Sequence, residues 1–115
     1  MHAYLRSFLP LTVALALAAG FASAGEPKTP LGKWMKPNVG APLAGQDFPT
    51  LQKSLDLVAS KPPAGNDYPQ WATLAKAGSA AAAKQDLAGV KASCKQCHDA
   101  YKEKYQKDFP TRPFP

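Results

Sequence analysis

Cys94, Cys97 and His98 are the side chains in this sequence whose types and spacing indicate a definite chemistry. On a helix, residues at positions i, i+3 and i+4 share one face, so the two thiols and the imidazole would point toward the same object. A Cys-x-x-Cys-His run is the attachment sequence of c-type haem, in which both thiols bond to the porphyrin and the histidine binds the iron. The motif therefore predicts one covalently attached haem c, with Cys94 and Cys97 as anchors and His98 as the proximal iron ligand.

Three other uses of the two cysteines fit the sequence less well. A thioredoxin-like site requires the pair to follow a strand in a βαβ pattern, and no part of this sequence has the pattern of a strand. A closed zinc site requires four ligands, whereas the chain has two cysteines and two histidines, and His2 lies in a segment that we expect to be removed. A disulfide between the cysteines stays open as an alternative, but it gives no role to His98.

The first 24 residues have the features of a secretory signal peptide. Arg6 supplies a positive charge, residues 9–19 form an apolar stretch, and residues 22–24 form an A-x-A cleavage site. The apolar stretch is too short for a comfortable membrane span, which needs about 20 residues, although an uncleaved anchor is the alternative. We expect residues 1–24 to be a signal peptide and residues 25–115 to be one monohaem domain in the periplasm, because bacterial c-type haem is attached outside the cytoplasmic membrane.

Apolar residues at steps of three and four predict an all-α fold. The proline- and glycine-rich residues 25–45 exclude a long helix but permit one short helical turn, capped by Thr29, with Pro30 in its first position and an end before Pro37. Three clearer helices are expected to follow, and they open at Gln46 or Asp47, at an N-cap on Asp67, and at about Asp86.

The last of these helices carries the haem motif and should run to about Lys107. Its apolar face and its haem-bonding face coincide, and residues 80–83 of the preceding helix, all alanine, would let a flat ring approach closely. Only 17 residues follow His98, and none of them is methionine or histidine. The haem must therefore be covered by the part of the chain that precedes the motif.

A chain with its haem motif on the last helix resembles the class II c-type cytochromes, meaning cytochrome c-prime and its low-spin relatives. Cys94, Cys97 and His98 match the haem-binding residues of that family, and Tyr101 and Lys102 match the aromatic and basic residues that usually follow its histidine. The resemblance implies an antiparallel helix bundle with the haem motif on the C-terminal helix. Because this chain is short and begins with a proline-rich segment, we expect three to four helices, a wrapped N-terminal segment, and a homodimer as one way of completing the bundle.

The second axial ligand decides between two functions. Without residues 1–24, Met35 is the only methionine, and in low-spin relatives the distal methionine comes from the same N-terminal region. If Met35 binds iron, the haem suits the transfer of single electrons between redox partners. If Met35 only fills the core, the open site suits small gases such as nitric oxide or carbon monoxide. We do not expect an enzyme, because a peroxidase-like reaction needs a distal acid–base group and no histidine remains for it.

The charge of the chain is positive and concentrated near the haem motif. The formal net charge is +6, and loss of residues 1–24 would remove only Arg6 from the charged residues. The lysines on and around the haem helix are Lys91, Lys95, Lys102, Lys104 and Lys107. They form either an ordinary solvated face or a docking surface for redox partners that are acidic at the contact. Nucleic acid is not an expected partner, because we expect the chain to be exported and because it has no interleaved aromatic and basic residues outside the haem helix.

Overall fold

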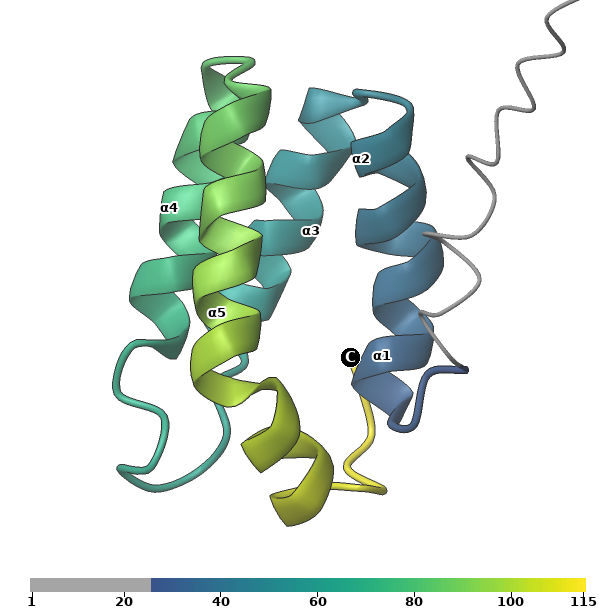
Figure 1. Ribbon diagram of the computed structural model, residues 1–115, viewed down its shortest axis with the longest axis vertical. Coiled ribbons are helices and arrows are strands. Elements are labelled where there is room, and N and C mark those ends of the chain that lie inside the picture. Colours follow the sequence, from purple (N-terminus) through teal and green to yellow (C-terminus); the bar gives the residue numbers. More distant parts are fainter. Residues whose placement is uncertain (1–25) are drawn as a thin grey trace, which may run out of the picture.

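The computed structural model describes residues 26–115, so the predicted signal peptide, residues 1–24, lies outside the described part of the chain. Its elements are α1 (Pro30–Met35), the π-helical turn η1 (Lys36–Gly40), α2 (Ala41–Ala44), α3 (Phe48–Ser60), α4 (Trp71–Ala83) and α5 (Leu87–Asp108). Residues 26–115 contain no strand. Because α1, η1 and α2 follow one another without a break, they form a single rod, and this rod and the next three helices make an antiparallel bundle (Figure 1). The predicted all-α bundle with the motif on the C-terminal helix is confirmed.

The start of the rod agrees with the sequence-based prediction. Thr29 is the N-cap of α1, and its hydroxyl accepts a hydrogen bond from the backbone N–H of Gly32 at 3.0 Å. Pro30 is in the first position of the helix, where its missing N–H would have had no intrahelical partner.

The continuation of the rod past Pro37 corrects the prediction of one short helical turn followed by a wrapped loop. In η1 the backbone widens, and the N–H of Ala41 donates to the carbonyl of Lys36, five residues earlier. Pro37 and Pro42 each fall in the first turn of a helical stretch, where a missing N–H breaks no bond of that stretch. The prolines therefore divide the rod into three short helical stretches without ending it. The rod itself is the fourth segment of the bundle, beside α3, α4 and α5.

Helix α3 begins as predicted, whereas α4 begins later than predicted. The Asp47 side chain accepts a hydrogen bond from the N–H of Thr50 at 3.3 Å and caps α3. Asp67 does not cap α4, because α4 begins only at Trp71. The N–H of Gln70, at the N-cap position, donates instead to the Tyr101 hydroxyl of α5 at 2.7 Å. A side chain distant in sequence thus fixes the residue before α4, and α4 has no side-chain cap of its own.

The turn between α4 and α5 fixes where the haem helix begins. Gln85 has a positive φ of 55°, and the Asp86 side chain accepts a hydrogen bond from the N–H of Gly89 at 3.0 Å. Helix α5 then runs from Leu87 to Asp108, close to the predicted bounds. Every helix of residues 26–115 is too short or too polar to span a membrane.

Two buried clusters hold the four segments together. The aromatic cluster consists of Leu31, Val58, Ala59, Tyr68, Trp71, Ala75, Tyr101 and Tyr105. The aliphatic cluster consists of Val39, Leu51, Leu55, Ala82 and Val90. Met35 packs against both clusters, Cys97 packs against the aromatic cluster and Cys94 against the aliphatic one. The predicted haem-binding residues therefore lie at the junction of the two clusters.

Candidate haem site

Two hollows lie between the rod and the other helices. The larger is a cleft of about 570 Å³ lined by α1, the residues before it, α4 and α5, and the smaller has a volume of about 240 Å³. Met35, Cys97 and His98 line both hollows, and Cys94 lines the smaller one. The larger volume is in the range of about 300–1,000 Å³ that is usual for small-molecule and cofactor sites. The structure thus brings all four predicted site residues to one pair of adjoining hollows.

The two cysteines are free thiols on α5, and both are half-buried. Burial raises the pKa of the Cys94 thiol, although a backbone hydrogen bond opposes that change. Burial also raises the pKa of the Cys97 thiol, and the neighbouring Cys94 raises it further. Both groups therefore remain protonated thiols at neutral pH in the folded chain.

His98 is exposed toward the hollows, yet the surrounding chain removes enough water to affect its imidazole. This desolvation lowers the pKa of His98, and the positive charge of Lys102 lowers it further, while Asp99 acts in the opposite direction. A neutral imidazole keeps a nitrogen lone pair free at neutral pH, as an axial iron ligand requires.

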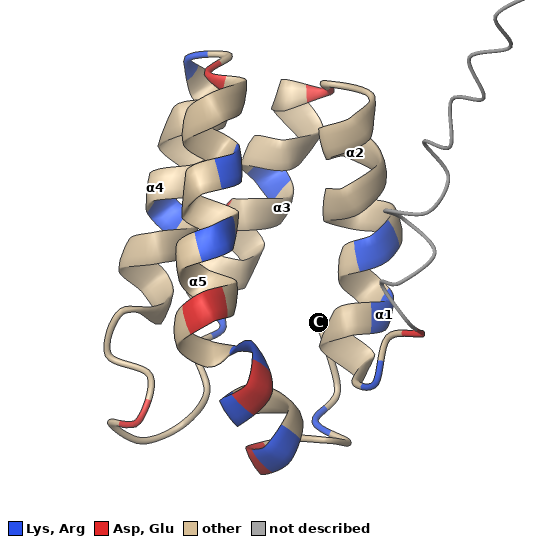
Figure 2. Ribbon diagram, in the orientation of Figure 1, with Lys and Arg blue, Asp and Glu red and all other residues tan. Residues whose placement is uncertain are grey.

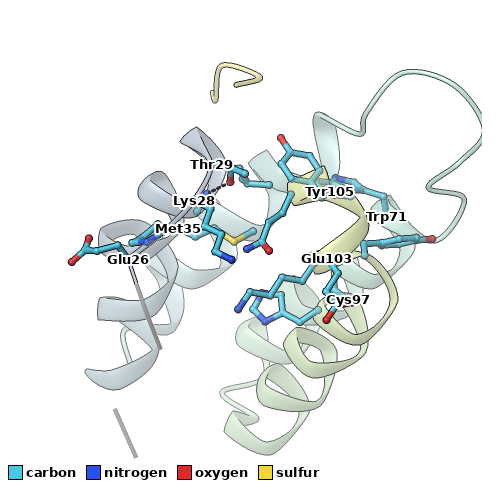
Figure 3. A pocket seen from close by; sticks show the side chains of 15 residues that line it. Glu26, Lys28, Thr29, Met35, Trp71, Cys97, Glu103 and Tyr105 are labelled. Atoms are coloured by element: carbon cyan, nitrogen blue, oxygen red, sulfur yellow. Dashed lines mark hydrogen bonds between the residues drawn. The ribbon is translucent and has the colours of Figure 1, made fainter. Parts of the chain in front are cut away.

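Met35 lies on the opposite wall from α5, at the end of α1. Figure 3 shows Met35 on α1 and Cys97 on the facing helix, with the cleft between them. The turn that carries Met35 is fixed by a side-chain bond, because Asn38 Nδ2 donates to the carbonyl of Trp34 at 2.8 Å. Met35 is half-buried, which leaves part of its side chain facing the hollows.

The walls of the hollows suit a flat apolar group. Ala75, Gly78 and Ser93 give the smaller hollow short side chains on α4 and α5. A Cβ at Gly78 would lie only 3.0 Å from Leu55 Cδ1 and 3.4 Å from Ser93 Cβ, so glycine is needed for this close approach. Residues 80–83, which the sequence suggested for this role, line neither hollow. The spacing of three between Ala75 and Gly78 was the signal that could have identified the correct wall.

The Tyr105 side chain indicates whether the site suits a group that carries hydrogen-bond acceptors. Its hydroxyl is buried and has no hydrogen-bond partner among the described residues, and the residue lines the larger cleft. A buried hydroxyl without a partner costs free energy, so a bound group that carries an acceptor would relieve it. By contrast, Trp71 Nε1 is already bonded to the carbonyl of Val58 at 2.8 Å, which makes Trp71 a core residue that also borders the cleft. Thiols, imidazole, thioether, apolar walls and a free hydroxyl together fit a carboxylate-bearing porphyrin.

A comparison with protein families concerns the part of the chain that carries the motif. A helical bundle that carries a thiol–imidazole motif on its last helix is similar to the haem-binding c-type cytochromes. The family model described as Cytochrome C' matches residues 56–102, from α3 to α5, and so confirms the resemblance to the class II c-type cytochromes. Covalently bound haem c follows from that resemblance. Comparisons with curated proteins and with solved structures found no match.

Proposed function

We propose that this protein is an exported monohaem cytochrome that carries single electrons between redox partners in the periplasm, rather than an enzyme. The observation that carries the proposal is the position of Met35 on the wall opposite His98, in both hollows that the motif lines. Ligation by histidine and methionine raises the reduction potential and leaves no iron position for a substrate, which suits an electron carrier. The signal-peptide pattern of residues 1–24 supports export.

Each predicted site residue has one task in this proposal. Cys94 and Cys97 anchor the haem to α5, and His98 on the same helix is the proximal ligand. Met35 approaches from the rod as the distal ligand and excludes water from that side. The haem, when bound, supplies a metal centre that gains and loses one electron. The Tyr105 hydroxyl is a candidate to donate a hydrogen bond to a propionate, since it lacks any other partner among residues 26–115.

The partner surface that we propose differs from the set of lysines that the sequence suggested. Lys95 and Lys104 each pair with an aspartate four residues later, Asp99 at 2.5 Å and Asp108 at 2.7 Å. These pairs reduce the field that either lysine can offer a partner. Lys102 has no ion pair among the described residues and lines the larger cleft.

The rod contributes lysines that the sequence analysis did not connect with the site. Lys28 lines the larger cleft and Lys36 the smaller one, so with Lys102 they stand on both sides of the opening. Figure 2 shows basic residues both on the rod and on α5. Glu26 and Glu103 also line the larger cleft, and their negative charges reduce the net positive charge at the opening. We propose that an acidic partner docks over these three lysines, which we call the rim lysines.

The ligation state of the iron tests this function. Wild-type holoprotein should be low-spin, show the weak red thioether-to-iron band when ferric, and bind carbon monoxide slowly. Met35→Ala should abolish that band, lower the potential and speed carbon monoxide binding, because the distal position becomes free. Leu43→Ala is the matched control, since Leu43 lines the smaller hollow on the same rod but has no atom that can bind iron. Wild-type protein that is already high-spin and takes up carbon monoxide at once would overturn the proposal and favour binding of small gases.

A further inference from the structure

Helix α1 faces α5 across the larger cleft, so the two helices do not pack against each other along that side (Figures 1 and 3). Leu31 anchors α1 in the aromatic cluster, with 5% of its surface exposed. Toward its other end, the rod meets α3 through η1 and α2. The distance between Met35 and α5 therefore depends on what holds the first turn of the rod in place.

The C-terminal tail, residues 109–115, crosses from the end of α5 to α1 (Figure 1). Its first contact is Phe109, whose ring centroid lies 5.9 Å from that of Tyr68 and 5.5 Å from that of Tyr105. This contact fixes the start of the tail on the aromatic cluster.

The middle of the tail is held by Arg112. Its Nη2 donates to the carbonyls of Lys61 at 3.2 Å and Pro62 at 3.4 Å, in the loop between α3 and α4. Because this loop follows directly from α3, the tail is tied to the body of the bundle before it reaches the rod.

The end of the tail contacts the residue next to the predicted iron ligand. The ring centroids of Phe114 and Trp34 lie 4.8 Å apart, at an interplanar angle of 63°, in an edge-to-face arrangement. Trp34 precedes Met35 in α1, and its carbonyl accepts the hydrogen bond from Asn38 that fixes the following turn. A displacement of Trp34 would therefore be transmitted to Met35 through the backbone.

We propose that the C-terminal tail is a strap that holds α1 at the distance from α5 at which Met35 can reach the haem iron. Phe114 is then a positioning residue, which acts through Trp34 and does not itself touch the iron. The proposal rests on the proposed function, because it assigns the strap a role in ligation by Met35. Three successive attachments, at Phe109, Arg112 and Phe114, connect α5, the α3–α4 loop and α1.

Phe114→Ala in the holoprotein tests the strap. Loss of one edge-to-face aromatic contact should raise the fraction of protein with Met35 detached, and with it the carbon monoxide association rate, by about two- to tenfold. The red thioether-to-iron band should weaken, and the backbone amides of residues 31–35 should exchange hydrogen faster. Phe114→Tyr should restore wild-type behaviour because it keeps the ring. Thr111→Ala is the matched control, since Thr111 is exposed in the same tail.

The outcomes separate this proposal from the proposed function. If wild-type protein shows the red band and Phe114→Ala leaves the band, the carbon monoxide rate and the amide exchange unchanged, the strap is overturned while ligation by Met35 stands. If wild-type protein lacks the band, ligation by Met35 and the positioning role of Phe114 both fail. Amide exchange in residues 31–35 then decides the remaining claim, because unchanged exchange in Phe114→Ala would show that the tail does not hold α1.

Discussion

Asp108 is the residue through which hydrogen bonds join the α3–α4 loop to the end of α5. Its carboxylate accepts a bond from the Lys104 ammonium at 2.7 Å and one from the Tyr68 hydroxyl at 2.9 Å. The Lys104 bond lowers the pKa of Asp108, and the Tyr68 bond lowers it further. Lys104 also lies 4.3 Å above the centre of the Tyr68 ring. This small group fixes the α3–α4 loop to the end of α5, beside the aromatic cluster.

The lowered pKa of Asp108 gives a pH dependence with a definite sign. Ionised Asp108 stabilises the folded state at any pH above its unfolded pKa of about 4, and this contribution is lost as the pH falls through the lower folded value. Asp108→Asn should therefore lower the melting temperature at neutral pH, and the difference from wild type should shrink as the medium is acidified. Thermal unfolding followed by circular dichroism would measure it, with Asp99→Asn, an exposed member of a pair on the same helix, as control. A difference that persists unchanged below about pH 3 would contradict this assignment.

At the scale of elements, α3, α4 and α5 pack closely around Gly78. Gly78→Val should destabilise the fold by about 1–3 kcal/mol, because the added side chain must displace Leu55 and Ser93. It should also reduce haem incorporation, since Gly78 lines the smaller hollow. Ala77→Val is the matched control: it introduces the same side chain at the neighbouring, exposed position of α4. Chemical denaturation and the ratio of haem to protein would measure both effects, and equal values for the two variants would contradict the packing argument.

The elements that could be predicted from the sequence are those whose signals are local. Asp47 and Asp86 cap their own helices, so the starts of α3 and α5 were predicted within a residue or two. The start of α4 could not be, because the N–H of Gln70, the residue before the helix, is bonded to the hydroxyl of Tyr101, which lies 31 residues away. The rod was missed because proline was expected to end a helix, whereas a π-helical turn allows Pro37 to begin a new stretch.

At the scale of the whole molecule, the site likewise contains residues that a local sequence signal predicts and residues that no local signal predicts. Cys94, Cys97 and His98 are adjacent in sequence, so a short motif was enough to bring them together on one face. Met35 was proposed only from its scarcity and from a family resemblance, and its approach to the motif depends on the path of the entire rod. Lys28 and Lys36 were not connected with the site at all, since their position at the opening is set by packing between distant segments.

Charge at the opening gives a prediction for the whole molecule. Lys102→Glu should slow oxidation of the reduced protein by the anion ferricyanide about two- to tenfold at low salt, because the rim lysines attract negative charge. The same variant should speed oxidation by a cationic cobalt complex, and salt should weaken both effects, since screening acts over about 8 Å at physiological ionic strength. Stopped-flow kinetics would measure the rates. Lys76→Glu, an equal charge change on an exposed part of α4, should have much less effect; equal effects would contradict a local docking surface.

The separation of the two cysteines between two buried clusters has a consequence for how the protein matures. Cys94 packs with the aliphatic cluster and Cys97 with the aromatic cluster, and both thiols are half-buried once the bundle has formed. An attachment enzyme that must reach both sulfur atoms and bring a porphyrin to them would find neither freely accessible in the completed fold. Covalent attachment should therefore precede closure of the bundle, so that the two clusters condense around a cofactor already joined to the chain. On the proposed function, the chain would be exported first, haem would be attached next, and the rod would fold against α5 only afterwards.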